Sequence, residues 1–143
     1  KLIVMPHPLV ADQVKLKKDD EVWKYYVDGK KYDDLLKETK LLITDYSSIS
    51  YDAFYRGSNV IFDWEEKEIC MREYGENGHL MLTEELAFGD ICYNSESMGG
   101  VIAAAYSRPQ QQEHIENYSR IVEFHDGNNC GRFIEMAKSD GIL

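Results

Sequence analysis

Residues 41–64 read "LLITDYSSISYDAFYRGSNVIFDW", and this stretch decides the fold. The apolar run 41–44 is typical of a fully buried strand. Residues 48–57 have the spacing of a short amphipathic helix that Gly57 closes. A second apolar run, 59–64, predicts another strand. A strand, a helix and a strand joined by short links predict a βαβ unit with parallel strands.

The sequence on both sides extends this pattern. Upstream we predict a strand at 2–5 that leaves through the loop "PHP", a strand at 21–29 and a helix at 31–40. We therefore predict an α/β fold, with a Rossmann-like parallel sheet flanked by helices. Such sheets bind ligands at the carboxyl ends of their strands.

Downstream the pattern becomes more helical. We expect a polar loop with one helical turn around residues 69–74, a short strand near "DICY", and then the C-terminal helices. These are a helix at 95–107 capped by Ser95 or Ser97, a helix at 109–124 with Pro109 in its first turn, and a last helix from about Cys130.

Length and composition indicate one domain, residues 1–143, with C-terminal helices over about 109–143. The net charge of −10 argues against nucleic-acid binding and against docking on anionic lipid. No apolar run approaches the roughly 20 residues that span a membrane. The chain begins at Lys1 without a Met, and we expect it to be a fragment of a longer protein. The three cysteines have no metal-binding spacing, so we expect reduced thiols and no metal site.

The segment "TDYSS" (44–48) has two interpretations. The start of a helix presents unpaired N–H groups, and the hydroxyls of Ser47 and Ser48 add donors, which suits a phosphate oxygen. Alternatively, Ser47 or Ser48 caps the helix and Asp45 caps a turn. Local chemistry alone leaves both open.

Three further features are weaker. His7, held between two prolines, suits a phosphate contact or assistance to a leaving group, but for a lone histidine an exposed loop position is the commoner interpretation. Asp126-Gly127 marks a turn before a helix and a second anion site, or a plain turn. The acidic run 63–68 is most simply a solvated surface.

In this order, these features resemble a known family. "LLITDYSSISYDAFYRGSNVIF", with His7-Pro8 before it and Asp126-Gly127 after it, resembles the CDP-glycerol:poly(glycerophosphate) glycerophosphotransferases, the teichoic-acid polymerases and primases. The resemblance spans nearly the whole chain. The chain departs from the family at "FDWEEKE", where "FYxxD" is usual.

The resemblance implies the C-terminal, donor-binding half of a two-domain GT-B transferase. It implies that His7, Thr44, Ser47 and Ser48 hold the donor pyrophosphate, with Asp45 anchoring the turn and His7 assisting catalysis. By the same resemblance Asp126 and Gly127 lie near that crevice, and the cytidine lies around Val27, Asp28 and Gly29.

The implied reaction is the transfer of glycerol phosphate from CDP-glycerol to a hydroxyl of a polymer or lipid-linked acceptor, with release of CMP and without a cofactor. The implied partner is an N-terminal acceptor domain of the same protein, which supplies the general base. The implied location is the cytoplasmic face of a bacterial membrane, without direct membrane contact from this fragment. Two alternatives stay open: the donor half of another GT-B enzyme that uses a nucleotide sugar or CDP-polyol, and a non-catalytic α/β interaction module.

Overall fold

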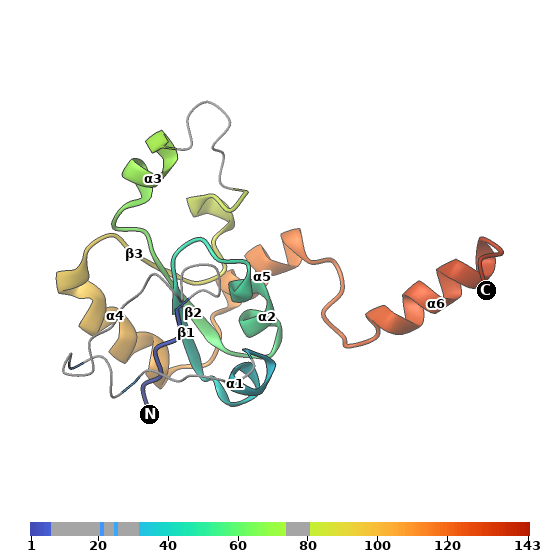
Figure 1. Ribbon diagram of the computed structural model, residues 1–143, viewed down its shortest axis with the longest axis horizontal. Coiled ribbons are helices and arrows are strands. Elements are labelled where there is room, and N and C mark those ends of the chain that lie inside the picture. Colours follow the sequence, from blue (N-terminus) through green and yellow to red (C-terminus); the bar gives the residue numbers. More distant parts are fainter. Residues whose placement is uncertain (7–20, 22–24, 26–31, 74–80) are drawn as a thin grey trace. The chain divides into compact units, whose positions relative to one another are not determined.

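The computed structural model of the chain describes residues 1–6, 21, 25, 32–73 and 81–143 (Figure 1). These residues fall into two compact units, Lys1–Glu38 and Thr39–Leu143, and each unit is described by itself.

The first unit contains helix α1, Tyr32–Glu38, which confirms the helix predicted at 31–40. Leu36 is the buried residue of α1, as its amphipathic pattern indicates. The strand predicted at 2–5 is reduced to a single bridge residue, Val4, whose N–H donates to the carbonyl of Tyr25 at 2.8 Å. The strand predicted at 21–29 lies largely outside the described residues.

The second unit is built on a three-stranded sheet. Strands β1 (Leu41–Thr44), β2 (Asn59–Asp63) and β3 (Asp90–Cys92) lie in the order β1-β2-β3, and both pairs are parallel. The predicted βαβ unit is therefore confirmed, together with the short strand at "DICY". The α/β class with a parallel sheet is confirmed as well.

Helices fill the connections and the C-terminal part of this unit, close to the predicted positions. A short 3₁₀ turn, η3 (Glu84–Leu86), precedes β3. The helices are α2 (Ile49–Tyr55), α3 (Lys67–Glu73), α4 (Ser95–Ser107), α5 (Gln112–Ile121) and α6 (Asn129–Ser139).

Two predicted helix starts are wrong. The cap of α4 is Asn94, whose side chain accepts from the N–H of Ser97 at 2.9 Å, so neither predicted serine is the cap. Helix α5 begins after Pro109 rather than around it. The amide of Gln110 donates to two carbonyls near the end of α2, at 2.8 and 2.9 Å. These bonds hold the segment before α5 outside the helix.

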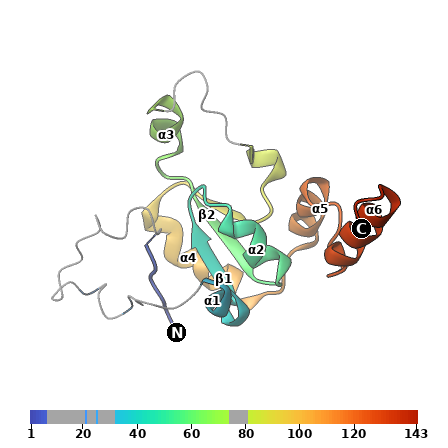
Figure 2. The ribbon, with the colours of Figure 1, turned by 45° about the vertical axis from the view of Figure 1, so that its right-hand side comes forward.

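Strand β2 separates two cores because its side chains alternate between the faces of the sheet. Ile61 packs with Cys92 and with Ala105 of α4 on one face. Phe62 packs with Phe88 on the other face, beside α2, and their rings lie 5.3 Å apart. Helices α2 and α4 thus cover opposite faces of the sheet (Figures 1 and 2).

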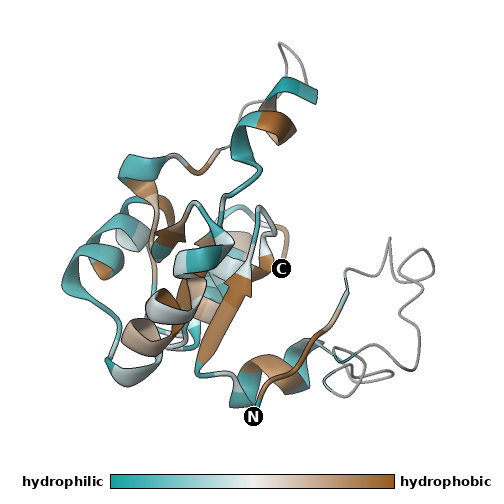
Figure 3. Cartoon of the chain, turned by 90° about the vertical axis from the view of Figure 1, so that its left-hand side faces the viewer, coloured by the Kyte–Doolittle hydropathy of each residue, from teal (hydrophilic) through white to brown (hydrophobic). Residues whose placement is uncertain are grey.

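Strand β1 differs from its prediction as a fully buried strand. Its residues are only partly buried, and Ile43 is 37% exposed. The reason is its position, since β1 is the edge strand of the sheet in the described residues. Its composition is nevertheless apolar, and a brown strand stands out against largely teal helix surfaces in Figure 3.

Candidate functional site

Polar side chains gather where β1 and β2 end, at the carboxyl edge of the sheet. Two pockets open there, and both are lined by Asp45 and Tyr46, which directly follow β1. This edge is where parallel α/β sheets bind ligands, because the connections diverge as they leave the strands.

The first, which we call the serine pocket, has a volume of about 420 Å³. Three serines form its polar side, and aromatic and aliphatic side chains form the rest. It is lined by Asp45, Tyr46, Ser47, Ser48, Ser50, Tyr51, Phe62, Trp64, Met81 and Leu82. A largely apolar pocket with a few hydroxyls at one side is a common form of a small-molecule site.

The turn into α2 is arranged differently from a conventional helix cap. Ser48 occupies the cap position, but its side chain makes no capping hydrogen bond. The Ser47 hydroxyl lies 3.5 Å from the Ile49 nitrogen, a marginal distance. The cap interpretation of the two hydroxyls therefore finds little support in the geometry.

The backbone of this turn is already engaged in part. The N–H groups of Ser50 and Tyr51 donate to the carbonyls of Ser47 and Ser48, at 3.2 and 3.1 Å. The unpaired N–H groups predicted at this helix start are therefore fewer than expected. Because α2 has only 7 residues, the polar groups that this turn could offer an anion are the serine hydroxyls rather than a long helix dipole.

Trp64 anchors the turn through the backbone of Asp45. Its indole N–H donates to the Asp45 carbonyl at 3.3 Å, and its ring lies 6.5 Å from that of Tyr46 in a stacked arrangement. Lys67 places its ammonium 4.2 Å from the Trp64 ring centroid and pairs with Glu84. The carbonyl of Asp45, rather than its carboxylate, thus fixes the turn.

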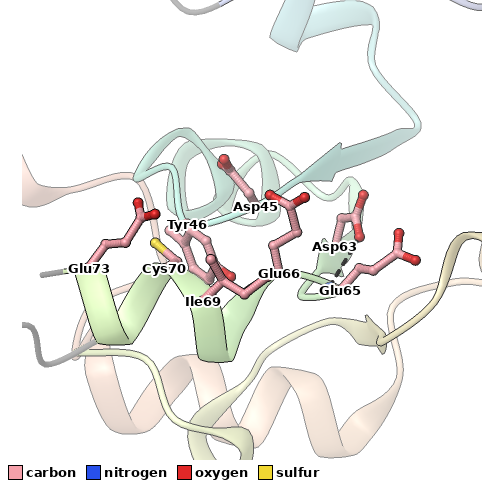
Figure 4. A pocket seen from close by; sticks show the side chains of 8 residues that line it. All are labelled: Asp45, Tyr46, Asp63, Glu65, Glu66, Ile69, Cys70 and Glu73. Atoms are coloured by element: carbon pink, nitrogen blue, oxygen red, sulfur yellow. Dashed lines mark hydrogen bonds between the residues drawn. The ribbon is translucent and has the colours of Figure 1, made fainter.

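The second pocket, which we call the acidic pocket, has a volume of about 790 Å³. Its walls come from the end of β2 and from α3, and carboxylates dominate them (Figure 4). It is lined by Asp45, Tyr46, Asp63, Glu65, Glu66, Ile69, Cys70 and Glu73. These carboxylates repel a phosphate, which separates the acidic pocket in character from the serine pocket.

Tyr46 stands between the two pockets with a buried hydroxyl that has no hydrogen-bond partner among the described residues. Burial raises the pKa of Tyr46 to about 12, and the nearby charges of Cys70 and Asp45 contribute. The hydroxyl therefore stays protonated at neutral pH and is a free donor.

We expect Tyr46→Phe to leave the free energy of unfolding unchanged or to raise it by about 1 kcal/mol, because a buried hydroxyl without a partner is a cost to the folded state. Urea unfolding followed by circular dichroism measures this. The matched control is Tyr118→Phe, which removes a hydroxyl that does have a partner and is expected to lose about 1 kcal/mol. If Tyr46→Phe lowers the free energy of unfolding by more than about 1 kcal/mol, the Tyr46 hydroxyl has a hydrogen-bond partner after all.

The structure brings together only part of the predicted site. Asp45, Ser47 and Ser48 line the serine pocket, and Thr44 immediately precedes them as the last residue of β1. The other predicted contacts in the N-terminal region lie outside the described residues: His7, Val27, Asp28 and Gly29.

Asp126 and Gly127 line neither pocket. The Gly127 N–H donates to the hydroxyl of Tyr55 at 2.8 Å, at the end of α2 opposite the serines. The Asp126 carboxylate accepts from the Asn128 N–H at 3.0 Å and pairs with Arg132, which lowers the pKa of Asp126 to about 2. This residue organises the start of α6.

Several pocket residues were not anticipated. Asp63, Glu65 and Glu66 belong to the acidic run that was interpreted as a solvated surface, and no role was predicted for Tyr46 or Trp64. The sequence contains one sign of these residues: "FDWEEKE" departs from the family pattern directly after a predicted strand.

Two kinds of feature are absent from the described ranges. No group of three or more His, Cys, Asp or Glu side chains there is placed to hold a metal ion. Nor does any helix of these ranges combine the length and apolar character needed to cross a membrane.

Fold and pockets together define a parallel α/β domain with a candidate ligand site at the carboxyl edge of its sheet. The chain matches the CDP-glycerol:poly(glycerophosphate) glycerophosphotransferase family over residues 1–137, and it belongs to that family. The resemblance carried by "TDYSS" is therefore confirmed.

A curated relative is the minor teichoic acid biosynthesis protein GgaB of Bacillus subtilis (strain 168), which is 26% identical over 141 residues. That alignment covers 92% of this chain but only 14% of GgaB. No solved structure matches the chain.

Proposed function

We propose that the chain is the donor-binding half of a GT-B enzyme that transfers glycerol phosphate from CDP-glycerol to a hydroxyl acceptor. The observation that carries the proposal is the position of Ser47 and Ser48. The chain belongs to this family, and their side chains line a pocket at the carboxyl edge of a parallel sheet. Ser48 makes no side-chain capping hydrogen bond, and Ser47 makes only a marginal one.

In the proposed reaction an acceptor hydroxyl attacks the β-phosphorus of CDP-glycerol. The bond from that phosphorus to the oxygen that bridges to CMP breaks, and CMP leaves with the bonding electrons. The hydroxyls of Ser47 and Ser48 donate to the phosphate oxygens and stabilise their charge. His7 donates to the departing phosphate, and the cytidine lies around Val27, Asp28 and Gly29.

The serine pocket suits the diphosphate better than the acidic pocket does. Its wall carries one carboxylate, that of Asp45, whereas the acidic pocket carries five. Tyr46 offers its protonated hydroxyl at the boundary of the two. Asp126 and Gly127 have a supporting role at α6 in this proposal rather than a contact with the donor.

The remaining parts of the reaction belong to an N-terminal acceptor domain of the same protein, which supplies the general base. The acceptor is a teichoic acid or a related cell-envelope polymer or its lipid-linked precursor, used at the cytoplasmic face of the membrane. GgaB is described as a teichoic acid biosynthesis protein, which supports this class of acceptor.

Isothermal titration calorimetry with the 143-residue chain tests the donor assignment. We expect weak, saturable binding of CDP-glycerol and CDP, weaker binding of CMP, and no transfer by the chain alone. UDP and UDP-glucose are the matched controls for the nucleotide. Tighter binding of UDP than of CDP would contradict the cytidine assignment, and robust transfer by this chain alone would contradict the need for a second domain.

A second candidate function keeps the fold and changes the transferred group. The carboxylates of Asp63, Glu65 and Glu66 are suitable acceptors for hydroxyl groups, and they stand where the family pattern differs. This favours a donor with a larger hydroxylated group, a sugar or a longer polyol. Competition between CDP-glycerol and CDP-ribitol for the same chain separates the two candidates by their relative affinity.

A further inference from the structure

Helix α2 is held along its length by side chains from a later segment of the chain. The Tyr118 hydroxyl donates to the carbonyl of Tyr51 at 3.1 Å, and the Gln110 amide donates to that of Phe54 at 2.8 Å. The His125 Nε2 lies 2.7 Å from the carbonyl of Tyr55. A carbonyl only accepts, so His125 carries its proton on Nε2 in this contact.

Tyr118 is the member of this set nearest to the serine pocket. It binds Tyr51, which lines that pocket, and the Tyr51 N–H in turn donates to the Ser48 carbonyl at 3.1 Å. One residue of α2 therefore connects the Tyr118 hydroxyl to the turn that carries the serines. Gln110 and His125 act at the other end of the helix.

The surroundings of Tyr118 make this contact rigid. Its side chain is only 2% exposed, and its ring lies 4.8 Å from that of Phe54 and 5.1 Å from that of Phe88. Burial raises the pKa of Tyr118 to about 12, so its hydroxyl remains a donor throughout the physiological range.

We infer that Tyr118 is a positioning residue for the donor phosphate, because it sets the placement of the first turn of α2 and with it the hydroxyls of Ser47 and Ser48. It acts through the backbone of Tyr51 and touches no ligand itself. A binding turn held by buried side chains loses less freedom when the ligand arrives. The identity of the ligand in this inference rests on the proposed function. The effect of Tyr118 on the placement of the turn does not.

Tyr118→Phe is the test, because it keeps the ring contacts and removes only the hydroxyl. Amide hydrogen exchange in the free chain is expected to rise about threefold to tenfold at Ser50 and Tyr51, as one hydrogen bond is lost. It is expected to stay unchanged at Ser97, in the first turn of α4, which opens locally and has no hydrogen bond to Tyr118. The affinity for CDP-glycerol, measured by calorimetry, is expected to fall by a similar factor. Ser119→Ala is the control, since its hydroxyl bonds only within α5, and it should change neither quantity.

Unchanged exchange at Ser50 and Tyr51 in Tyr118→Phe would overturn the inference, and so would faster exchange with unchanged affinity. A rise by the same factor at Ser97 would mean that Tyr118 supports the whole unit and not the serine turn in particular, and it too would overturn the inference. If the unaltered chain does not bind CDP-glycerol, the proposed donor is wrong, and the exchange measurement alone decides whether Tyr118 holds the turn.

Discussion

Transfer of glycerol phosphate from CDP-glycerol is expected to fall at least about 100-fold in kcat/KM when Ser47 and Ser48 are both replaced by alanine. Removing a single donor to transition-state charge costs enzymes about 100-fold to 1,000-fold. The change removes only the hydroxyls of Ser47 and Ser48 and leaves the rest of the serine pocket in place. The measurement is CMP release at low donor concentration by a protein that also contains the proposed acceptor domain.

The same double variant is expected to lose less than about 1 kcal/mol of stability, because Ser48 makes no capping bond and Ser47 only a marginal one. The matched control replaces Ser107 and Ser119, two exposed serines whose hydroxyls bond within their own helices. Full activity in the Ser47/Ser48 variant would contradict the proposed phosphate contact of the two serines. It would favour the alternative in which this chain is a non-catalytic module.

Gly89→Ala is expected to destabilise the second unit by about 3 kcal/mol. Gly89 is buried immediately before β3, and a Cβ there would come within 3.0 Å of the Val60 carbonyl carbon, and closer still to its oxygen. Val60 lies in the central strand β2, so its backbone has little room to move. Urea unfolding followed by circular dichroism measures the loss.

Gly100→Ala is the control for this substitution. Gly100 lies within α4, where a Cβ would meet nothing within 4 Å, and alanine is the better helix former by about 1 kcal/mol. The two glycine variants should therefore shift stability in opposite directions. A Gly89→Ala chain as stable as the unaltered one would mean that β2 and β3 separate easily at this point.

The βαβ unit was predictable because its signals are local. Two apolar runs, the amphipathic pattern of 48–57 and the closing Gly57 all lie within residues 41–64. In the structure Gly57 has a φ of 93°, which favours glycine. Burial was less predictable, because an apolar composition does not say whether a strand is central or at an edge. Ile43 looks like a core residue in sequence and is 37% exposed in the fold.

The part of the site that lies in one continuous segment of the sequence was predictable. Ser47 and Ser48 come directly after a strand, so their position at the carboxyl edge follows from the topology. Glu65 and Glu66 line the acidic pocket only because side chains of α3 lie beside Asp45 and Tyr46 in the fold, and a charge run carries no signal for that. Gly127 is separated from the serines by the length of α2, which no local pattern reports.

The contacts that hold α2 also decide when the pocket forms during synthesis. The Tyr118 hydroxyl binds a carbonyl 67 positions earlier, and His125 binds one 70 positions earlier. On the ribosome, α2 is thus made long before its partners emerge, and pairings across such distances form slowly. The nascent chain therefore carries its serine turn without the support of Tyr118 and His125 until both residues have left the exit tunnel, and only then is α2 held at both ends.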